Sequence, residues 1–233
     1  MQVLAAVTPR PRPSRRTATL IITPIVVLIA MSTLGDALTT SWADTHPLAL
    51  LALNSRNRIV LLVTNQLDPV SYYVVGTLRL LASDPLFFLL GMFYGDTAVQ
   101  WVERKSKTFG DQLRIYEKLF SKAAYPLVFV MPNNFICLFA GASGMGLVAF
   151  VSLNLTGTIA RLYLLRVAGD VFSGPIDSVL RFFADYRLPL FIVSVVLVGG
   201  IVLLDRRRGT SEIGALLEFE EVVEAAVPED ADE

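Results

Sequence analysis

The side chains that could carry chemistry in this sequence are charged or amide groups that interrupt apolar stretches. Asp68 and Asp96 stand in or beside such stretches. A carboxylate inside a membrane costs ~2.5–3.5 kcal/mol on insertion scales, so it requires a partner or a wet cavity. Desolvation would raise the pKa of a buried carboxyl group, which suits a proton carrier. For Asp68, which precedes a proline, the competing interpretation is a helix cap.

Arginines supply the candidate contacts for an anionic group. Arg56, Arg58 and Arg79 fall within one interrupted segment, and Arg161 lies inside a later apolar run. The planar donors of a guanidinium match the geometry of phosphate oxygens. The alternative for the first three is that their heads snorkel to the outer membrane interface. Arg161 faces either a helix bundle or the outer headgroups.

Amide groups and glycines mark a second interrupted segment. Asn133 and Asn134 follow a proline and could satisfy freed backbone groups or line a polar path, although ordinary turn chemistry explains them equally well. Gly141, Gly144 and Gly157 are small residues of the kind that let membrane helices approach closely. We therefore assign the glycines to helix packing.

Several classes of site are excluded or unsupported by the residue inventory. The chain has one cysteine and one histidine, which excludes an intrachain disulfide and a Cys/His zinc cluster. Cys137 sits in an apolar run, where an inert buried thiol is expected. No hydrolase triad, phosphate loop, paired metal ligands or nucleic-acid-binding signature is present. The sequence predicts no enzyme, no cofactor and no bound metal.

Composition indicates the environment in which these residues act. The chain has 233 residues, of which 54% are hydrophobic and 18% charged, and its mean hydropathy is +0.57. So few charges could not cover so much apolar surface in water, but a bilayer removes that need. We predict an all-α integral membrane protein with about four transmembrane helices, two opposed re-entrant helical hairpins and amphipathic interfacial helices.

The expected spans follow from uncharged or nearly uncharged runs of about 20 residues. They lie at residues 17–34, 85–102, 147–168 and 188–204. For the first run a cleaved signal peptide is the rival interpretation, because a basic start before a short apolar run is its signature. The length of the run and the spans that follow favour an uncleaved helix.

Two further apolar segments, 47–82 and 123–142, are too broken to span with clean flanks. Broken backbone at membrane depth is tolerated where it is buried in protein or lines a wet cavity. We therefore expect both to be re-entrant, with two poor spans as the alternative for 47–82. Apolar residues at helical spacing predict amphipathic helices at 103–122 and 172–183.

Charge distribution divides the chain and orients it. A basic, proline-rich leader (1–17) and an acidic tail (209–233) are expected to be disordered around a polytopic membrane domain (18–208). Nine of the 21 acids lie in the tail, which leaves a net charge of +8 for residues 1–208. Thirteen of the 20 bases cluster in the leader, in 103–122 and in 206–208. Four spans with both termini cytoplasmic place all three clusters on the cytoplasmic side of the membrane.

Several short motifs together resemble the DedA family, also called the VTT or SNARE-associated Golgi protein family. The similarity covers about residues 47–170, and its strongest part is the small-residue run 140–145 with Phe150, Asn154 and Gly157. The other motifs are Phe93-Tyr94-Gly95-Asp96, Arg104, and Leu67-Asp68 followed by Gly76. The resemblance implies a multispan protein with two opposed re-entrant hairpins that moves or flips lipids, including polyprenyl-phosphate carriers, with proposed proton coupling.

The sequence departs from the family pattern at the residues that matter for an anionic lipid. The family usually has arginines in its second hairpin, whereas residues 127–134 contain no base, and an earlier acid of the first hairpin is also missing. The leading expectation is a protein that moves a lipid or amphiphile across the cytoplasmic membrane. The alternative is a non-transporting scaffold or envelope-homeostasis protein that lost the arginine site. Membrane lipids are the expected partners, and a homo-oligomer is left open.

Overall fold

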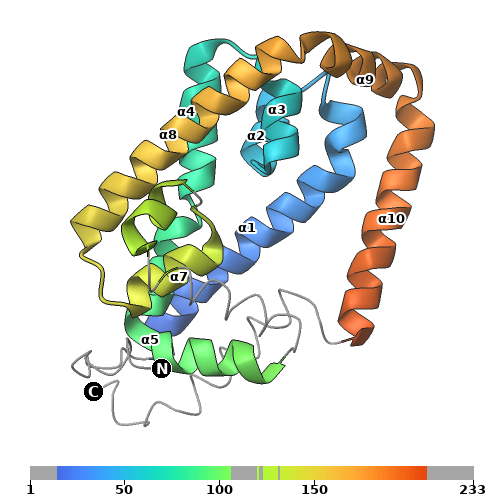
Figure 1. Ribbon diagram of the computed structural model, residues 1–233. Helices are drawn as coiled ribbons and strands as arrows, with labels where there is room; N and C mark the ends of the chain where they lie inside the picture. The colour runs from blue at the N-terminus through green and yellow to red at the C-terminus, as the bar shows by residue number, and fades with distance from the viewer. Residues whose placement is uncertain (1–14, 106–119, 121–122, 131, 209–233) are drawn as a thin grey trace. The chain divides into compact units, whose positions relative to one another are not determined.

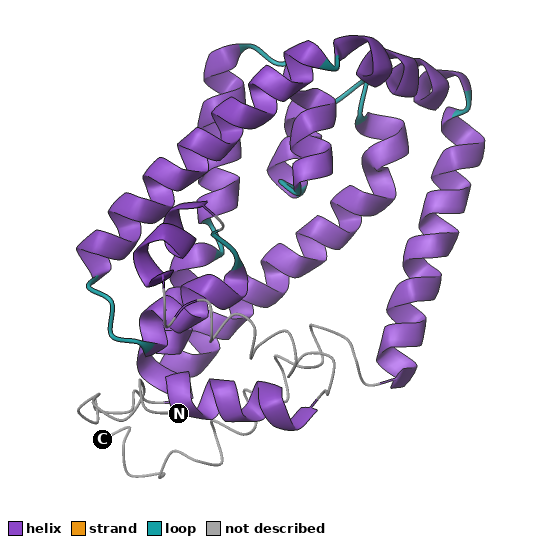
Figure 2. Ribbon diagram, viewed as in Figure 1, coloured by secondary structure: helices purple, strands orange, loops and turns teal. Residues whose placement is uncertain are grey.

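The structure is a computed structural model that describes residues 15–105, 120, 123–130 and 132–208. Residues 1–14 of the predicted leader, the predicted tail and most of the predicted amphipathic helix at 103–122 lie outside these residues. Residues 15–17, also assigned to the leader, are helical. Within the described ranges the chain is helical, and no strand is present (Figure 2). The all-α prediction is confirmed.

The long helices alternate with short ones along the chain (Figure 1). In order they are α1 (Arg15–Trp42), α2 (Pro47–Leu53), α3 (Asn57–Val63), a 3₁₀ turn (Thr64–Gln66), α4 (Pro69–Leu81), α5 (Asp84–Lys105), α7 (Asn134–Ala142), α8 (Leu147–Val171), α9 (Ser173–Asp185) and α10 (Arg187–Arg208). Residues 123–130 are also helical. Two pairs of short helices, α2 with α3 and 123–130 with α7, lie where the sequence predicts interrupted segments.

Four helical stretches of the described chain are long and apolar enough to cross a membrane, as predicted. They are Thr17–Trp42, Pro69–Gly95, Leu147–Val171 and Arg187–Leu204. The first is eight residues longer than expected, because Gly35, a residue type that often ends helices, is helical here and packs against Asn54 instead. It therefore continues through Asp36 to Trp42.

The second stretch differs from the expected one. It covers Pro69–Gly95 rather than residues 85–102, so the half of the predicted first hairpin that follows Pro69 belongs to a span. Pro69 provides the helix start, since proline fits the first turn, and only Ala82 and Ser83 separate α4 from α5. The interrupted segment is thereby reduced to α2, α3 and the 3₁₀ turn.

The described helices fall into two compact units, each built from separate parts of the chain. Unit 2 comprises Val27–Leu81 and Thr158–Ser211. Its core joins α2 and α3 to α4 and α8: Tyr72 and Leu162 are fully buried there with side chains from both short helices. The members of this core are Ala43, Leu50, Leu51, Ile59, Val60, Val63, Tyr72 and Leu162.

Unit 1 comprises Met1–Val26, Ala82–Gly157 and Glu212–Glu233. Its described part packs α7 along α5 around an aromatic core in which Phe88 of α5 stacks on Phe150 of α8, with ring centroids 4.2 Å apart. The core residues are Phe88, Phe120, Val128, Ile136, Cys137, Phe139, Ala140, Met145 and Phe150. Cys137 is a buried free thiol within this core.

Helix α9 lies where the sequence predicts a second amphipathic helix. Ile176 is buried, and Leu180 and Phe183 pack against the core of unit 2. Val179 and Phe182 remain exposed. One face of α9 therefore completes the core of its own unit while apolar side chains also project from the rest of the helix.

Candidate functional site

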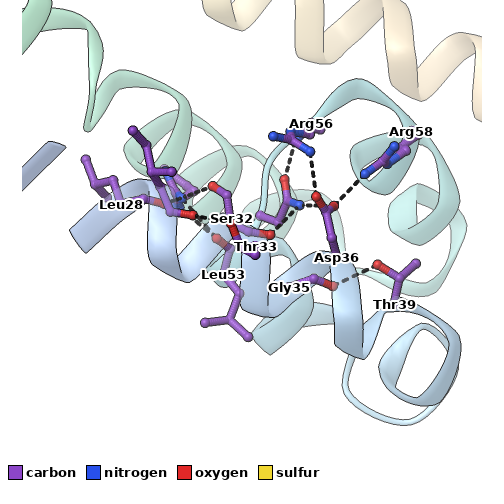
Figure 3. A network of polar contacts seen from close by, with 12 residues as sticks. Leu28, Ser32, Thr33, Gly35, Asp36, Thr39, Leu53, Arg56 and Arg58 are labelled. Atoms are coloured by element: carbon purple, nitrogen blue, oxygen red, sulfur yellow. Dashed lines mark hydrogen bonds and ion pairs between the residues drawn. The ribbon is translucent and has the colours of Figure 1, made fainter. Parts of the chain in front are cut away.

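The charged side chains of unit 2 converge where the turn between α2 and α3 meets α1. Gly35 makes this meeting possible: a Cβ atom on that residue would lie 2.6 Å from the Cβ atom of Asn54. The residue after Gly35 is Asp36, whose carboxylate points at the turn (Figure 3). Because Gly35 has no side chain, α1 approaches the end of α2 closely, and Asp36 lies beside that end.

Three groups of the turn bind the Asp36 carboxylate. Arg56 donates from Nη1 to Oδ2 at 2.5 Å, and Arg58 donates from Nη2 to Oδ1 at 2.6 Å. Asn54 donates from Nδ2 to Oδ1, also at 2.5 Å. We call Asp36, Asn54, Arg56 and Arg58 the turn cluster. With one carboxylate and two guanidiniums, its formal net charge is +1.

Asn54 holds the turn in shape. The residue is fully buried, and its amide also donates to the backbone oxygen of Ser32 at 3.0 Å. Its Oδ1 accepts from the backbone N–H of Arg56 at 3.0 Å, which closes a local Asx-type turn. Because a buried amide is costly when its polar atoms are left unpaired, these bonds fix the position of the turn on α1.

Exposure divides the turn cluster into a sheltered acid and two open cations. The Asp36 side chain is 15% exposed, whereas those of Arg56 and Arg58 are 54% and 64% exposed. Each guanidinium has five N–H donors. The contact with Asp36 uses one donor of Arg56 and one donor of Arg58. The outer faces of both arginines therefore have donors to offer to a further anion.

Arg79 lies next to the turn cluster but binds backbone rather than a carboxylate. From α4 its Nε and Nη2 atoms donate to the carbonyl oxygens of Ala52 and Leu53 at 3.0–3.2 Å. Nη2 also donates to Leu28 O at 3.1 Å and to Ser32 Oγ at 2.8 Å on α1. The last carbonyls of a helix lack intrahelical donors, so Arg79 caps α2 from outside and ties it to two long helices.

Two more arginines of unit 2, both on α8, contact the first interrupted segment between Asn57 and Tyr72. Arg161 donates to Asn57 Oδ1 at the start of α3, from Nε at 2.9 Å and also from Nη2. Arg166 lies 5.3 Å from the ring centroid of Tyr72, a cation–π distance, and its Nη atoms are 3.5 Å from the carbonyl oxygens of Thr64 and Leu67. Arg56, Arg58 and Arg79 of the first interrupted segment, like these two arginines of α8, thus have protein partners.

Asp68 is placed differently from what a proton carrier requires. It is fully exposed and precedes α4, where its Oδ1 accepts from the backbone N–H of Ser71 at 3.0 Å. Hydrogen bonds from Ser71 hold the pKa of Asp68 below its usual value. The carboxyl group acts as a helix cap, and the direction of its pKa shift is opposite to the one that desolvation would give.

The second interrupted segment, in unit 1, carries amides and glycines in packing roles. Asn133 caps α7, because its Oδ1 accepts from the backbone N–H of Ile136 at 2.9 Å. Asn134 begins the helix and is exposed. A Cβ atom on Gly141 would lie 2.0 Å from Phe88 O, and one on Gly157 would lie 2.1 Å from Phe129 O. Both glycines thus allow close backbone contacts.

Gly144 has a conformational rather than a packing role. It follows α7 with a φ of 78°, which is unfavourable for residues with a side chain. Its N–H bonds Gly141 O, and the N–H of Met145 bonds Ala140 O, both at 3.1 Å. This pair of bonds is the Schellman helix ending, in which glycine is favoured. The expectation of helix packing at Gly144 is therefore corrected.

Asp96 remains a sequence-based candidate. Its backbone belongs to α5, two residues after a kink at Tyr94, but its side chain lies outside the described part of the chain. Among the residues that were searched, no group of three or more His, Cys, Asp and Glu side chains could hold a metal ion. Arg56 and Arg58, whose side chains are exposed beside Asp36, present an arrangement suited to binding an anion.

Sequence reasoning missed Asp36 and Asn54, two of the four members of the turn cluster. Asp36 follows Gly35, a residue type that often ends helices, so the sequence predicts that it lies after the first span, whereas α1 continues to Trp42. Asn54 stood among the polar residues that break 47–82, next to Arg56. The close approach at Gly35 that brings them together is tertiary and leaves no local signal.

Comparison of the chain with protein-family models, curated proteins and solved structures finds no match in any of the three. The resemblance to the DedA family consequently rests on the motifs quoted above.

Proposed function

We propose that this protein moves a lipid or amphiphile across the cytoplasmic membrane, and that the turn cluster receives its headgroup. The observation that carries the proposal is the pair of exposed guanidiniums on Arg56 and Arg58, held by Asp36 at the turn between α2 and α3. Two arginines held side by side form a fork suited to a phosphate or other anionic headgroup.

Membrane depth supports this assignment. Asp36 lies six residues before Trp42, so it sits ~9 Å below that end of α1 at 1.5 Å per residue. Helix α2 has seven residues, which places the turn ~10 Å beyond Pro47. The two lengths agree. With Trp42 at the headgroup level, a preferred place for tryptophan, α2 and α3 form a hairpin that enters the membrane from outside.

Orientation and packing complete the proposal. With both termini cytoplasmic, the basic clusters face inside, as the positive-inside rule requires. The short helix pair of residues 123–142 then forms the second, opposed re-entrant segment. Broken helices at membrane depth are the places where transporters bind polar groups. In this protein the arginines lie in the first segment, so we assign the anion site to the first segment and scaffolding to the second.

A flux measurement tests the proposal. Full-length protein would be reconstituted into vesicles containing a labelled polyprenyl phosphate or labelled phospholipids, and the loss of label from the outer leaflet would be timed. We expect protein-dependent flux that falls at least tenfold in the double variant Arg56→Gln/Arg58→Gln. The matched control is Arg187→Gln, which removes the Arg187–Asp44 ion pair of 2.5 Å from the same unit.

The outcomes separate the two functions expected from the sequence. Flux that needs Arg56 and Arg58 but not Arg187 supports a lipid transporter with its headgroup site at the turn cluster. Absence of flux for every lipid, with the folded state verified by a cooperative thermal transition, would overturn the proposal in favour of a scaffold. Flux that is equal in the wild type and the double variant would remove the turn cluster from the path.

A further inference from the structure

The turn cluster contains its own anion. Asp36 already occupies one side of both guanidiniums, and it is more sheltered than either arginine. Any headgroup that binds Arg56 and Arg58 therefore meets a site of net charge +1 rather than +2. We infer that Asp36 is a specificity-determining residue that favours singly charged headgroups over doubly charged ones, an inference that rests on the proposed function.

The geometry shows why Asp36 stays in place when a headgroup arrives. Besides the two arginines, its Oδ1 accepts from the amide of Asn54 at 2.5 Å. Asn54 is itself fixed to Ser32 O and to the N–H of Arg56. Displacing the carboxylate would break this buried amide network. The headgroup instead binds the outer donors of Arg56 and Arg58, with the Asp36 charge remaining behind them.

The Asp36 charge affects phosphodiester and phosphomonoester headgroups differently, because the two carry different charges. A phosphodiester headgroup carries one negative charge, whereas a phosphomonoester carries between −1.5 and −2 near neutral pH. A site of charge +1 neutralises the diester and leaves the monoester with excess negative charge beside Asp36. Like charges that are close and partly shielded from water repel strongly. The Asp36 charge therefore weakens the binding of a monoester more than that of a diester, and it shifts the selectivity of the cluster toward the diester.

Neighbouring charges in unit 2 do not cancel this effect. Arg79 donates to backbone carbonyl oxygens and to Ser32 Oγ. Arg161 contacts Asn57, which separates Arg56 from Arg58 in the sequence. The guanidiniums of Arg79 and Arg161 raise the positive potential at the site for monoester and diester headgroups alike. Asp36 is the acid that directly contacts Arg56 and Arg58, so it sets the difference between the two classes.

The experiment compares two labelled lipids with the same acyl chains, phosphatidylglycerol as the diester and phosphatidic acid as the monoester. Binding and flux would be measured with full-length protein in phosphatidylcholine vesicles, buffered above the second pKa of a phosphomonoester, about 6. For Asp36→Asn we expect the monoester-to-diester ratio to rise about tenfold, because removing a charge in contact with the site relieves the repulsion. The control Asp44→Asn, which removes the acid of the Arg187 pair, should leave the ratio unchanged.

A second variant separates charge from structural damage. Asp36→Asn combined with Arg56→Gln restores a cluster charge of +1 while leaving Asp36 absent. We expect the lipid ratio of this double variant to return to the wild-type value even where total binding falls. A ratio that stays raised in the double variant, or one that is unchanged in Asp36→Asn while both lipids bind, would overturn the inference.

The same measurements keep this inference distinct from the proposed function. If only the inference about Asp36 is wrong, lipid flux still depends on Arg56 and Arg58, but the monoester-to-diester ratio is the same in the wild type and in Asp36→Asn. A failed proposed function gives no flux of either lipid by folded protein. Inorganic phosphate that competes as strongly as the lipids would also overturn the proposed function, because it would identify a site for a soluble anion.

Discussion

The two units of this protein build their interrupted helices in opposite ways. In unit 1 the segment around α7 is held by backbone contact, with Gly141 against Phe88 O and an aromatic stack of Phe88 on Phe150. In unit 2 the α2–α3 pair is held by arginines that bind a carboxylate, amides and carbonyls. Close packing has no spare donors, whereas the polar attachment leaves guanidinium donors exposed. The difference shows why the anion site is assigned to unit 2.

The largest expected effect breaks the packing of unit 1. In Gly141→Ala the new methyl group would lie 2.0 Å from Phe88 O and 2.7 Å from Met92 N, both backbone atoms. Neither can move without separating α5 from α7, so we expect a loss of about 3 kcal/mol or more in unfolding free energy. Thermal unfolding in detergent measures it. The control is Gly146→Ala, which meets nothing within 4 Å; equal melting temperatures for the two variants would contradict close packing.

The next effect removes the polar attachment of unit 2. Arg79→Met keeps the apolar stem but leaves the carbonyls of Ala52, Leu53 and Leu28 without their donor. An unpaired, fully buried acceptor costs ~1–3 kcal/mol, and this site is only partly buried. We therefore expect a total loss of about 2–3 kcal/mol in unfolding free energy. A cysteine placed at Ser55, in a protein whose Cys137 is replaced, should react faster with a thiol reagent. Unchanged reactivity would mean that Arg79 does not hold the turn.

A smaller effect tests the approach of the turn to α1. A methyl group in Gly35→Ala would lie 2.6 Å from the Cβ atom of Asn54, so the turn must shift away from Asp36. We expect a loss of about 1–2 kcal/mol, since a short turn can move more easily than a packed helix. The flux assay should show a greater loss than this stability change explains. Gly174→Ala, on an open surface of the same unit, is the matched control.

The smallest effect concerns Asp68. Asp68→Asn keeps a capping oxygen and should leave the melting temperature and flux nearly unchanged, whereas Asp68→Ala lowers the melting temperature slightly. Because hydrogen bonding lowers the folded-state pKa below 3.8, the ionised cap contributes stability above that pH and loses it as the pH falls through the folded-state pKa. Melting curves across acidic pH would show a larger loss in the wild type than in Asp68→Asn, which keeps the ion-paired carboxylates of Asp36 and Asp44. A pH-dependent flux abolished by Asp68→Asn would instead restore the proton-carrier hypothesis.

The sequence specified much of the fold because apolar run lengths and prolines act locally. Four spans and the interrupted nature of both short-helix segments follow from such signals. The second span was displaced because Arg79 was counted as an interruption, yet carbonyls of neighbouring helices accept its hydrogen bonds. Local patterns do not reveal tertiary partners of this kind.

The site was less predictable for the same reason. Arg56 and Arg58 were identified as candidates from residue type alone, but their anion, Asp36, lies about 20 residues earlier and reaches them only through contact at Gly35. Asn133 and Gly144 illustrate the reverse case. Their cap and positive-φ roles are local and could have been assigned from the Pro-Asn-Asn sequence and from the glycine that follows α7.

The shortness of α2 and α3 has a consequence for the membrane itself. In the proposed orientation, a turn ~10 Å below the headgroup level lies about a third of the way through a hydrocarbon core of ~30 Å. A headgroup bound to Arg56 and Arg58 would have ~20 Å of hydrocarbon still to cross. In that orientation the hairpin would locally thin the dielectric barrier, and it would lower the electrostatic work of moving a charge before any helix changes position.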